Sequence, residues 1–154
     1  MTPDNSPATS LISELSNTVG DQYVIWKPED LLVYEYDGSI DKATPSAVVL
    51  PASADEVAEV VRIANRHGAY IVARGAGTSL SGGAVPLQNS VVIALTRLTK
   101  LLEVDAENRI AIVEPGMINL HLSEKVSHLG LFYAPDPASQ KTCTIGGNVG
   151  ENAG

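Results

Sequence analysis

Two short apolar runs flank one strongly amphipathic segment, and the second run leads directly into a glycine-rich loop. Residues 47–50 (Ala-Val-Val-Leu) and 70–73 (Tyr-Ile-Val-Ala) have the length and composition of buried strands. Between them, Ser53-Ala-Asp-Glu56 matches a capping box, apolar residues recur at helical spacing over 57–64, and Gly68 stands where a left-handed helix end is favoured. The sequence therefore predicts a strand–helix–strand unit of the parallel type.

The pattern changes after a third apolar run at 91–95, which we interpret as another strand of the parallel unit. Residues 101–104 and 110–113 flank a polar, turn-like stretch and predict a β-hairpin. We therefore expect an α+β fold whose pairing changes from parallel to antiparallel near Thr99.

The remaining segments give weaker signals. Residues 1–9 are interpreted as a mobile tail, and Ser10 as the cap of a short helix through about Thr18. Residues 23–40 hold the only tryptophan and three of the five tyrosines, which suggests an arm packed on another element. Asn119 is predicted to cap a helix that Gly130 ends, whereas residues 133–154 show no helical period.

Composition excludes several classes of function. The 154 residues fit one domain, and a formal net charge of −8 argues against nucleic acid or an anionic membrane as the main partner. A single cysteine excludes an intrachain disulfide and a cysteine-based zinc site. The N-terminus does not resemble a signal peptide, and no apolar run is long enough for a transmembrane helix, so we expect a cytoplasmic protein.

We expect the isolated histidines, the cysteine and the tryptophan to have structural rather than catalytic or metal-binding roles. We expect His67 to favour the end of its helix, and His121 and His128 to be solvated rather than to share a metal, so no metal site is predicted. Cys143 is interpreted as a small buried filler and Trp26 as packing for the arm. The sequence shows no catalytic pair of carboxylates.

Glycine is concentrated in two places, four residues within 75–83 and four within 146–154. The first loop, residues 74–86, offers free backbone N–H groups, serine and threonine hydroxyls and one arginine, which suits a phosphate or diphosphate. It lacks the Gly-Lys-Ser/Thr ending of a Walker loop, and Leu80 stands where a Rossmann fingerprint has its third glycine. The alternative interpretation is a pair of ordinary flexible loops.

Three motifs together resemble a known family. They are Arg-Gly-Ala-Gly-Thr-Ser-Leu-Ser-Gly-Gly at 74–83, Pro-Asp-Pro at 135–137, and Cys-Thr-Ile-Gly-Gly-Asn-Val-Gly-Glu-Asn-Ala-Gly at 143–154. The chain resembles the FAD-binding domain of the vanillyl-alcohol oxidase/p-cresol methylhydroxylase (PCMH-type) superfamily, especially the glycolate oxidase and D-lactate dehydrogenase-like flavoproteins. The resemblance implies a truncated FAD-binding domain over 45–154, preceded by a tail, short helix and arm over 1–44.

The resemblance also implies a cofactor site between a parallel and an antiparallel subdomain. The residues that it places around the FAD diphosphate are Arg74, Gly75, Ala76, Gly77, Thr78, Ser79, Gly82 and Gly83. Those that it places beside the diphosphate and isoalloxazine are Pro135, Asp136, Ser139, Thr142, Thr144, Ile145, Gly146, Gly147 and Asn148. Because residues 74–86 contain no histidine, which links FAD covalently in some relatives, non-covalent FAD is expected.

The implied activity is oxidation of a 2-hydroxy acid, such as glycolate or D-lactate, by hydride transfer to flavin N5, with an external electron acceptor. The catalytic base and substrate clamp are expected outside this chain, which would be an N-terminal fragment able to associate through its incomplete sheet. Peripheral attachment to a membrane through partner subunits is an accompanying expectation. The alternatives are an FAD-dependent enolpyruvyl-sugar reductase that uses NADPH, and a non-catalytic nucleotide-binding fragment or inactive gene remnant.

Overall fold

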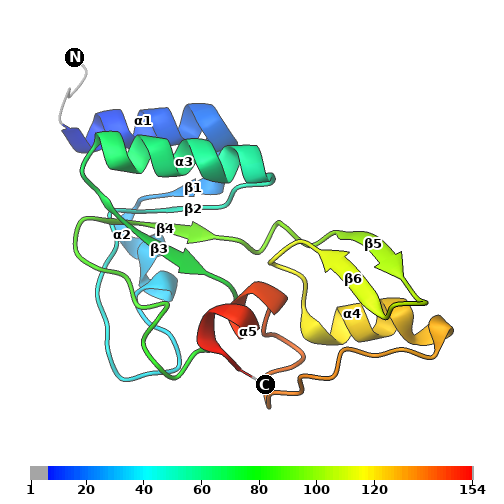
Figure 1. Ribbon diagram of the computed structural model, residues 1–154. Coiled ribbons are helices and arrows are strands. Elements are labelled where there is room, and N and C mark those ends of the chain that lie inside the picture. The colour runs from blue at the N-terminus through cyan, green and yellow to red at the C-terminus, as the bar shows by residue number, and fades with distance from the viewer. Residues whose placement is uncertain (1–6, 154) are drawn as a thin grey trace.

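The computed structural model describes residues 7–153, which form two units lying side by side (Figure 1). The first unit contains α1 (Pro7–Val19), η1 (Asp21–Tyr23), β1 (Val24–Ile25), α2 (Pro28–Leu31), η2 (Leu32–Tyr34), β2 (Ala47–Val49), α3 (Ala54–Arg66), β3 (Tyr70–Arg74) and β4 (Ser90–Ala94). The second contains β5 (Leu101–Asp105), β6 (Ile110–Val113), α4 (Asn119–Val126) and η3 (Ser127–Leu129), and α5 (Ile145–Glu151) lies between the two units (Figure 1). The predicted α+β fold, a parallel subdomain followed by an antiparallel one, is confirmed.

The first unit is built on a four-stranded sheet in the order β1-β2-β4-β3. Strands β2, β4 and β3 are parallel, so the predicted strand–helix–strand unit exists, but β4 lies between its two strands. Val48 and Val72 both pair with Val92, and the very short β1 adds an antiparallel edge. Every residue of β2 and β4 is buried, as expected of parallel strands covered on both faces.

Helices α1 and α3 cover one face of this sheet, and the arm covers the other (Figure 1). The helical side has a core that includes Leu11, Leu15, Val49, Val60, Ile63, Val91 and Ile93. On the opposite side, Leu31 and Tyr34 of the arm pack against Val48, Val72 and Val92. Within residues 23–40, Leu31 and Tyr34 thus pack on the sheet, whereas the arm as a separate part of the chain stays a prediction.

Helix α3 is bounded as its sequence predicts. The Ser53 hydroxyl accepts a hydrogen bond from the Glu56 N–H at 3.1 Å, and the Glu56 carboxylate accepts one from the Ala52 N–H at 2.7 Å. At the other end, Gly68 has a positive φ of 64°.

Helix α1 begins earlier than predicted, because Ser10 lies inside it rather than at its cap. Of the predicted tail, residues 1–6 lie outside the described residues, and residues 7–9 are helical. The predicted part of the helix is held by tertiary packing, since Leu11 and Leu15 are buried against the sheet, and Glu14 contacts Arg66 at 2.7 Å and His67 at 2.8 Å.

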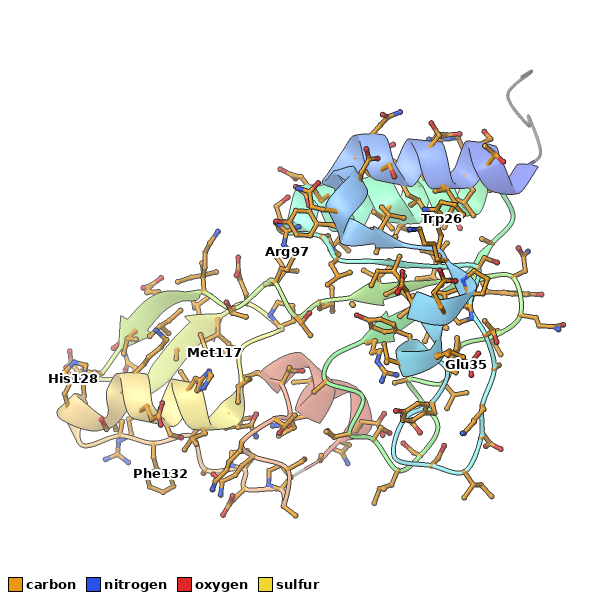
Figure 2. All side chains as sticks on the ribbon, turned by 180° about the vertical axis from the view of Figure 1, so that it is seen from behind. Trp26, Glu35, Arg97, Met117, His128 and Phe132 are labelled. Atoms are coloured by element: carbon orange, nitrogen blue, oxygen red, sulfur yellow. The ribbon has the colours of Figure 1, made fainter. Side chains whose placement is uncertain are left out.

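The second unit contains the predicted hairpin, β5–β6, packed on α4. Asp105 accepts a hydrogen bond from the Asn108 N–H at 3.0 Å in the turn, and Glu114 accepts one from the Lys100 N–H at 2.7 Å at the open end. Met117, Leu122 and Val126 form its small core. Other apolar side chains face solvent, including Leu102, Ile110 and Phe132, which is 75% exposed and points away from α4 (Figure 2).

Two predictions for the C-terminal third are wrong. Asn119 is the first residue of α4, preceded by Ile118, and its side chain caps nothing. Helix α5 occupies a stretch for which no helix was predicted. Its seven residues include three glycines and no apolar period, so it depends on a cap from Thr144 and on tertiary contacts rather than on helix propensity.

Candidate functional site

The two glycine-rich segments meet between the units. Strand β3 ends at Arg74, and α5 lies beside the loop that follows it (Figure 1). Gly75 contacts Thr144 so closely that a Cβ at position 75 would collide with the threonine hydroxyl. The structure therefore brings together two of the sequence segments predicted to form one site.

The first loop, residues 75–83, presents a row of unused backbone donors. Within residues 7–153, the N–H groups of Ala76, Gly77, Thr78, Gly82 and Gly83 donate to no protein acceptor. Gly77 and Gly82 have positive φ values of 72° and 78°, which L side chains rarely adopt. Consecutive free N–H groups in such a backbone can bind an anion without any cationic side chain at the surface.

Arg74 lies beneath this loop and is 8% exposed. Its Nη1 donates to the carbonyl oxygens of Tyr36 at 2.8 Å and Ala84 at 3.4 Å. Gly77 passes directly over the guanidinium, where a Cβ would collide with it. Arg74 thus supports the loop from the inside; a direct contact between Arg74 and a diphosphate stays a prediction.

Asp37, from the arm, is the buried carboxylate nearest to this cation and was not predicted as a site residue. Burial raises the pKa of Asp37, but hydrogen bonds from Ser39 and Ala84 and the charge of Arg74 outweigh it, so the pKa lies below its ordinary value. Burial lowers the pKa of Arg74, while the charge of Asp37 raises it in part. The charges of Asp37 and Arg74 therefore favour each other, and because Arg74 is buried, the neutral N–H groups remain the principal donors that the loop presents.

Helix α5 contributes little free donor capacity at its N-terminus. The N–H of Ile145 donates to the Met117 carbonyl at 2.8 Å, and that of Gly146 to the Pro115 carbonyl at 2.8 Å. The N–H of Gly147 donates to the Thr144 hydroxyl at 3.2 Å. Because these donors are satisfied by the protein, the loop at 75–83 is the better anion site of the two.

A buried amide pair fixes α5 against α4. The Asn148 Nδ2 donates to the Asn119 Oδ1 at 2.9 Å, and the two side chains are 5% and 2% exposed. The Nδ2 of Asn119 is buried and has no partner among the described residues. Asn119 was predicted as a helix cap, and only the folded chain shows that it positions Asn148.

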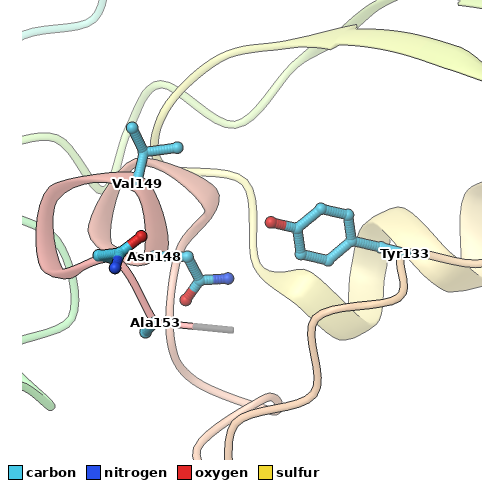
Figure 3. A pocket seen from close by; sticks show the side chains of 5 residues that line it. Tyr133, Asn148, Val149 and Ala153 are labelled. Atoms are coloured by element: carbon cyan, nitrogen blue, oxygen red, sulfur yellow. The ribbon is translucent and has the colours of Figure 1, made fainter.

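An open cavity of about 310 Å³ adjoins this pair and is lined by Tyr133, Asn148, Val149, Asn152 and Ala153. The Tyr133 hydroxyl points toward α5 across the cavity (Figure 3). The cavity combines one aromatic ring with amide groups, which suits a planar heterocycle with polar edges.

The approach to α5 contains the other predicted residues. Ser139 organises this segment, because its carbonyl accepts from the N–H groups of Thr142 at 2.7 Å and Cys143 at 2.8 Å. Pro135 and Ser139 are half-buried, whereas Asp136 and Thr142 are exposed. The segment is tied to α4 through the Asn119 N–H and the Cys143 carbonyl, 3.3 Å apart, so it belongs to the second unit's side of the site.

Glu151 is a further residue that the sequence interpretation missed. Its carboxylate accepts a hydrogen bond from the Ser81 hydroxyl and lies so close to Gly83 that a Cβ there would be 2.6 Å from Glu151 Oε1. A carboxylate from α5 therefore lies against the first glycine loop.

Three isolated reactive side chains lie as predicted, since Cys143 is buried and His121 and His128 are exposed. Residues 7–153 contain no cluster of three side chains able to hold a metal, and the absence of a metal site stays a prediction. His67 also makes a contact that was not predicted, since its Nε2 lies 2.8 Å from Glu14 Oε1, within hydrogen-bond distance. Trp26 is 51% exposed, so its contribution to packing is smaller than expected (Figure 2).

No helix in the part of the chain that the structure describes has both the length and the apolar character needed to cross a lipid bilayer.

Comparison with known proteins identifies relatives along nearly the whole chain. Glycolate oxidase subunit GlcD of Escherichia coli K12 is 41% identical over 147 residues, covering 95% of this chain and 30% of the relative. D-lactate dehydrogenase of Archaeoglobus fulgidus is 36% identical over 150 residues, covering 94% of this chain and 32% of the relative. The chain thus spans about a third of the length of these relatives.

Solved structures show the same fold. p-Cresol methylhydroxylase superposes with a TM-score of 0.82 at 23% identity, covering 94% of this chain and 29% of that structure. 4-Ethylphenol oxidase of Gulosibacter chungangensis superposes with a TM-score of 0.80 at 31% identity, covering 96% of this chain and 30% of that structure. The model of the FAD binding domain family matches residues 45–154, which include both glycine-rich segments, and the chain belongs to that family.

Proposed function

We propose that this chain is the FAD-binding part of a flavin-dependent oxidoreductase that oxidises a small 2-hydroxy acid. The observation that carries the proposal is the row of unused N–H groups at Ala76–Thr78, Gly82 and Gly83, above the buried Arg74. A diphosphate offers acceptor oxygens to such a row, and the protein's acidic net charge disfavours a purely electrostatic anion site. The named activities of the relatives, glycolate oxidase and D-lactate dehydrogenase, supply the substrate class.

The residues fit this cofactor in two parts. The loop after β3 would bind the diphosphate through the unused N–H groups of Ala76–Thr78, Gly82 and Gly83. Glycine at 75 and 77 lets the loop backbone pass close to Thr144 and Arg74, where a side chain would collide. The segment from Pro135 to Asn148 would run beside the diphosphate and the ring, with Asn148 held in place by Asn119. When bound, FAD supplies a two-electron acceptor that takes a hydride from the substrate's α-carbon.

This chain's own residues bind and orient rather than react. We assign no general base and no clamp for the substrate carboxylate to the chain, and propose that the rest of the intact protein supplies them. We also propose non-covalent FAD, since residues 74–86 contain no histidine, and the thiol of Cys143 is buried at 6% exposure.

The test uses the full natural polypeptide that carries this sequence, freed of flavin and then titrated with FAD. We expect one FAD to bind, to be released on denaturation, and to lose its visible absorption when glycolate, D-lactate or D-2-hydroxyglutarate is added without oxygen. Reduction by NADPH but by none of these acids would refute the substrate class. Absence of FAD binding would refute the proposal as a whole.

A further inference from the structure

A turn of the N-terminal arm holds the first glycine loop from both sides. The turn comprises residues 36–39 (Tyr-Asp-Gly-Ser) and precedes the family-matched residues 45–154. The Gly38 N–H donates to the Ser79 carbonyl at 2.7 Å, which fixes the first limb of the loop. The Ala84 N–H donates to Asp37 Oδ2 at 3.4 Å, which fixes the second limb.

Arg74 links the turn to the loop a third time. Its Nη1 binds the Tyr36 carbonyl at 2.8 Å and reaches the Ala84 carbonyl at 3.4 Å. Asp37 is 6% exposed, and its other oxygen accepts from the Ser39 N–H at 2.7 Å, so the carboxylate also shapes the turn itself. Hydrogen bonds shielded from water in this way are stronger than exposed ones.

Gly38 is required by space at the point where turn and loop touch. A Cβ at this position would lie 2.6 Å from the Ser79 carbonyl oxygen and 2.9 Å from Leu80 Cδ2. Gly38 is not among the residues with positive φ, so close approach of two backbones, rather than conformation, demands glycine here.

We propose that the turn at residues 36–39 is a positioning clamp for the cofactor loop. It holds the N–H groups of Ala76–Thr78, Gly82 and Gly83 in place for a diphosphate before the cofactor arrives. Asp37 and Gly38 are positioning residues that act through Ser79 and Ala84 and do not touch the cofactor. Because preorganisation raises affinity by lowering the cost of ordering, the clamp sets how tightly FAD binds, and in this it rests on the proposed function.

The test compares two clamp variants with matched controls in the full natural polypeptide. Gly38→Ala should weaken FAD binding at least about tenfold, since the added methyl displaces the Ser79 limb. Asp37→Asn should weaken it less, because one amide oxygen remains to accept a hydrogen bond. Gly150→Ala, whose Cβ would meet open space, and Asp30→Asn, at an exposed site of the same arm, should keep wild-type affinity.

Ile63→Val, in the core between α3 and the sheet, is the control for a general loss of stability. This variant should lower the Tm of the flavin-free protein without changing FAD affinity. The clamp is refuted if Gly38→Ala keeps wild-type FAD affinity, or if Ile63→Val loses as much affinity as Gly38→Ala at a similar Tm.

Failure of the proposed function would look different, because wild-type protein would then bind no FAD. In that case the clamp is judged by amide hydrogen exchange in the cofactor-free protein. Gly38→Ala should accelerate exchange at Ala84, the far limb of the loop, whereas Gly150→Ala should not. Unchanged exchange at Ala84 in Gly38→Ala would overturn the clamp.

Discussion

Replacing Gly77 by alanine tests whether the loop and Arg74 form one unit. Gly77 has a φ of 72° and lies over the Arg74 guanidinium, so Gly77→Ala adds both backbone strain and a collision. Gly130→Ala is a matched control, because its φ is 71° and a Cβ there would meet nothing within 4 Å. The two variants share the cost of a left-handed alanine, about 1–2 kcal/mol.

The difference between the variants isolates the contribution of Arg74. If the methyl displaces the guanidinium, its hydrogen bonds to the Tyr36 and Ala84 carbonyls are lost, which costs a further ~1.5–3 kcal/mol because the donor is charged. Chemical denaturation of both variants measures this difference, and FAD titration should show about tenfold weaker binding for Gly77→Ala alone. Equal stability losses and equal FAD affinities would refute the assignment of Gly77 and Arg74 to one cofactor-binding unit.

Three further perturbations follow from the same contacts. Asn119→Leu should lower the free energy of unfolding by about 1–3 kcal/mol, because it leaves the buried Asn148 amide without its acceptor. The control Asn17→Leu, on the exposed side of α1, should change this free energy little. Equal effects of the two substitutions would contradict the hydrogen bond between Asn119 and Asn148. The free energy of unfolding should fall as pH is lowered through the depressed pKa values of Asp37 and Glu14, because hydrogen bonds favour the ionised carboxylates in the folded state. Chemical denaturation at a series of acid pH values should show a smaller fall in this free energy for Asp37→Asn and Glu14→Gln. The same fall as in wild-type protein for both variants would count against these contacts. Glu151→Gln should strengthen FAD binding a few-fold and make it less sensitive to salt, because it removes a negative charge beside the loop. The control Glu107→Gln, on the distant hairpin turn, should leave FAD affinity unchanged. Weaker FAD binding by Glu151→Gln would contradict this and would show that the carboxylate contributes to cofactor binding.

Local signals in the sequence predict much of the first unit. The capping box at Ser53–Glu56, the apolar period behind it and Gly68 act within a few residues, so α3 is evident without tertiary information. Strands β2 and β4 are recognisable as continuous apolar runs because both faces of the sheet are covered there. Strand β3 is also a short apolar run, although it lies at the edge of the sheet and Tyr70 and Ile71 are exposed. The order of these strands in the sheet is not evident from the sequence, since the position of β4 between β2 and β3 depends on packing between distant segments.

In the candidate site, too, some features have a local signal in the sequence and others do not. Glycines at 75–83 mark the proposed cofactor loop in the sequence because special backbone conformations, such as the positive φ of Gly77 and Gly82, need glycine locally. Asp37, Asn119 and Glu151 carry no local signal, because each acquires its role from a partner 29 to 70 residues away. Helix α5 was missed for a related reason, since its glycines disfavour a helix and contacts with Pro115 and Met117 hold it.

The most direct test of the central claim is amide hydrogen exchange across the glycine loop, with and without FAD, in the full natural polypeptide. Visible absorption of the desalted protein confirms that FAD is bound. We expect exchange to slow at Ala76–Thr78, Gly82 and Gly83, whose N–H groups have no acceptor within residues 7–153. Exchange should change less at Ile145 and Gly146, whose N–H groups already bind carbonyls. Bound FAD with protection confined to α5, and none in residues 76–83, would contradict the central claim.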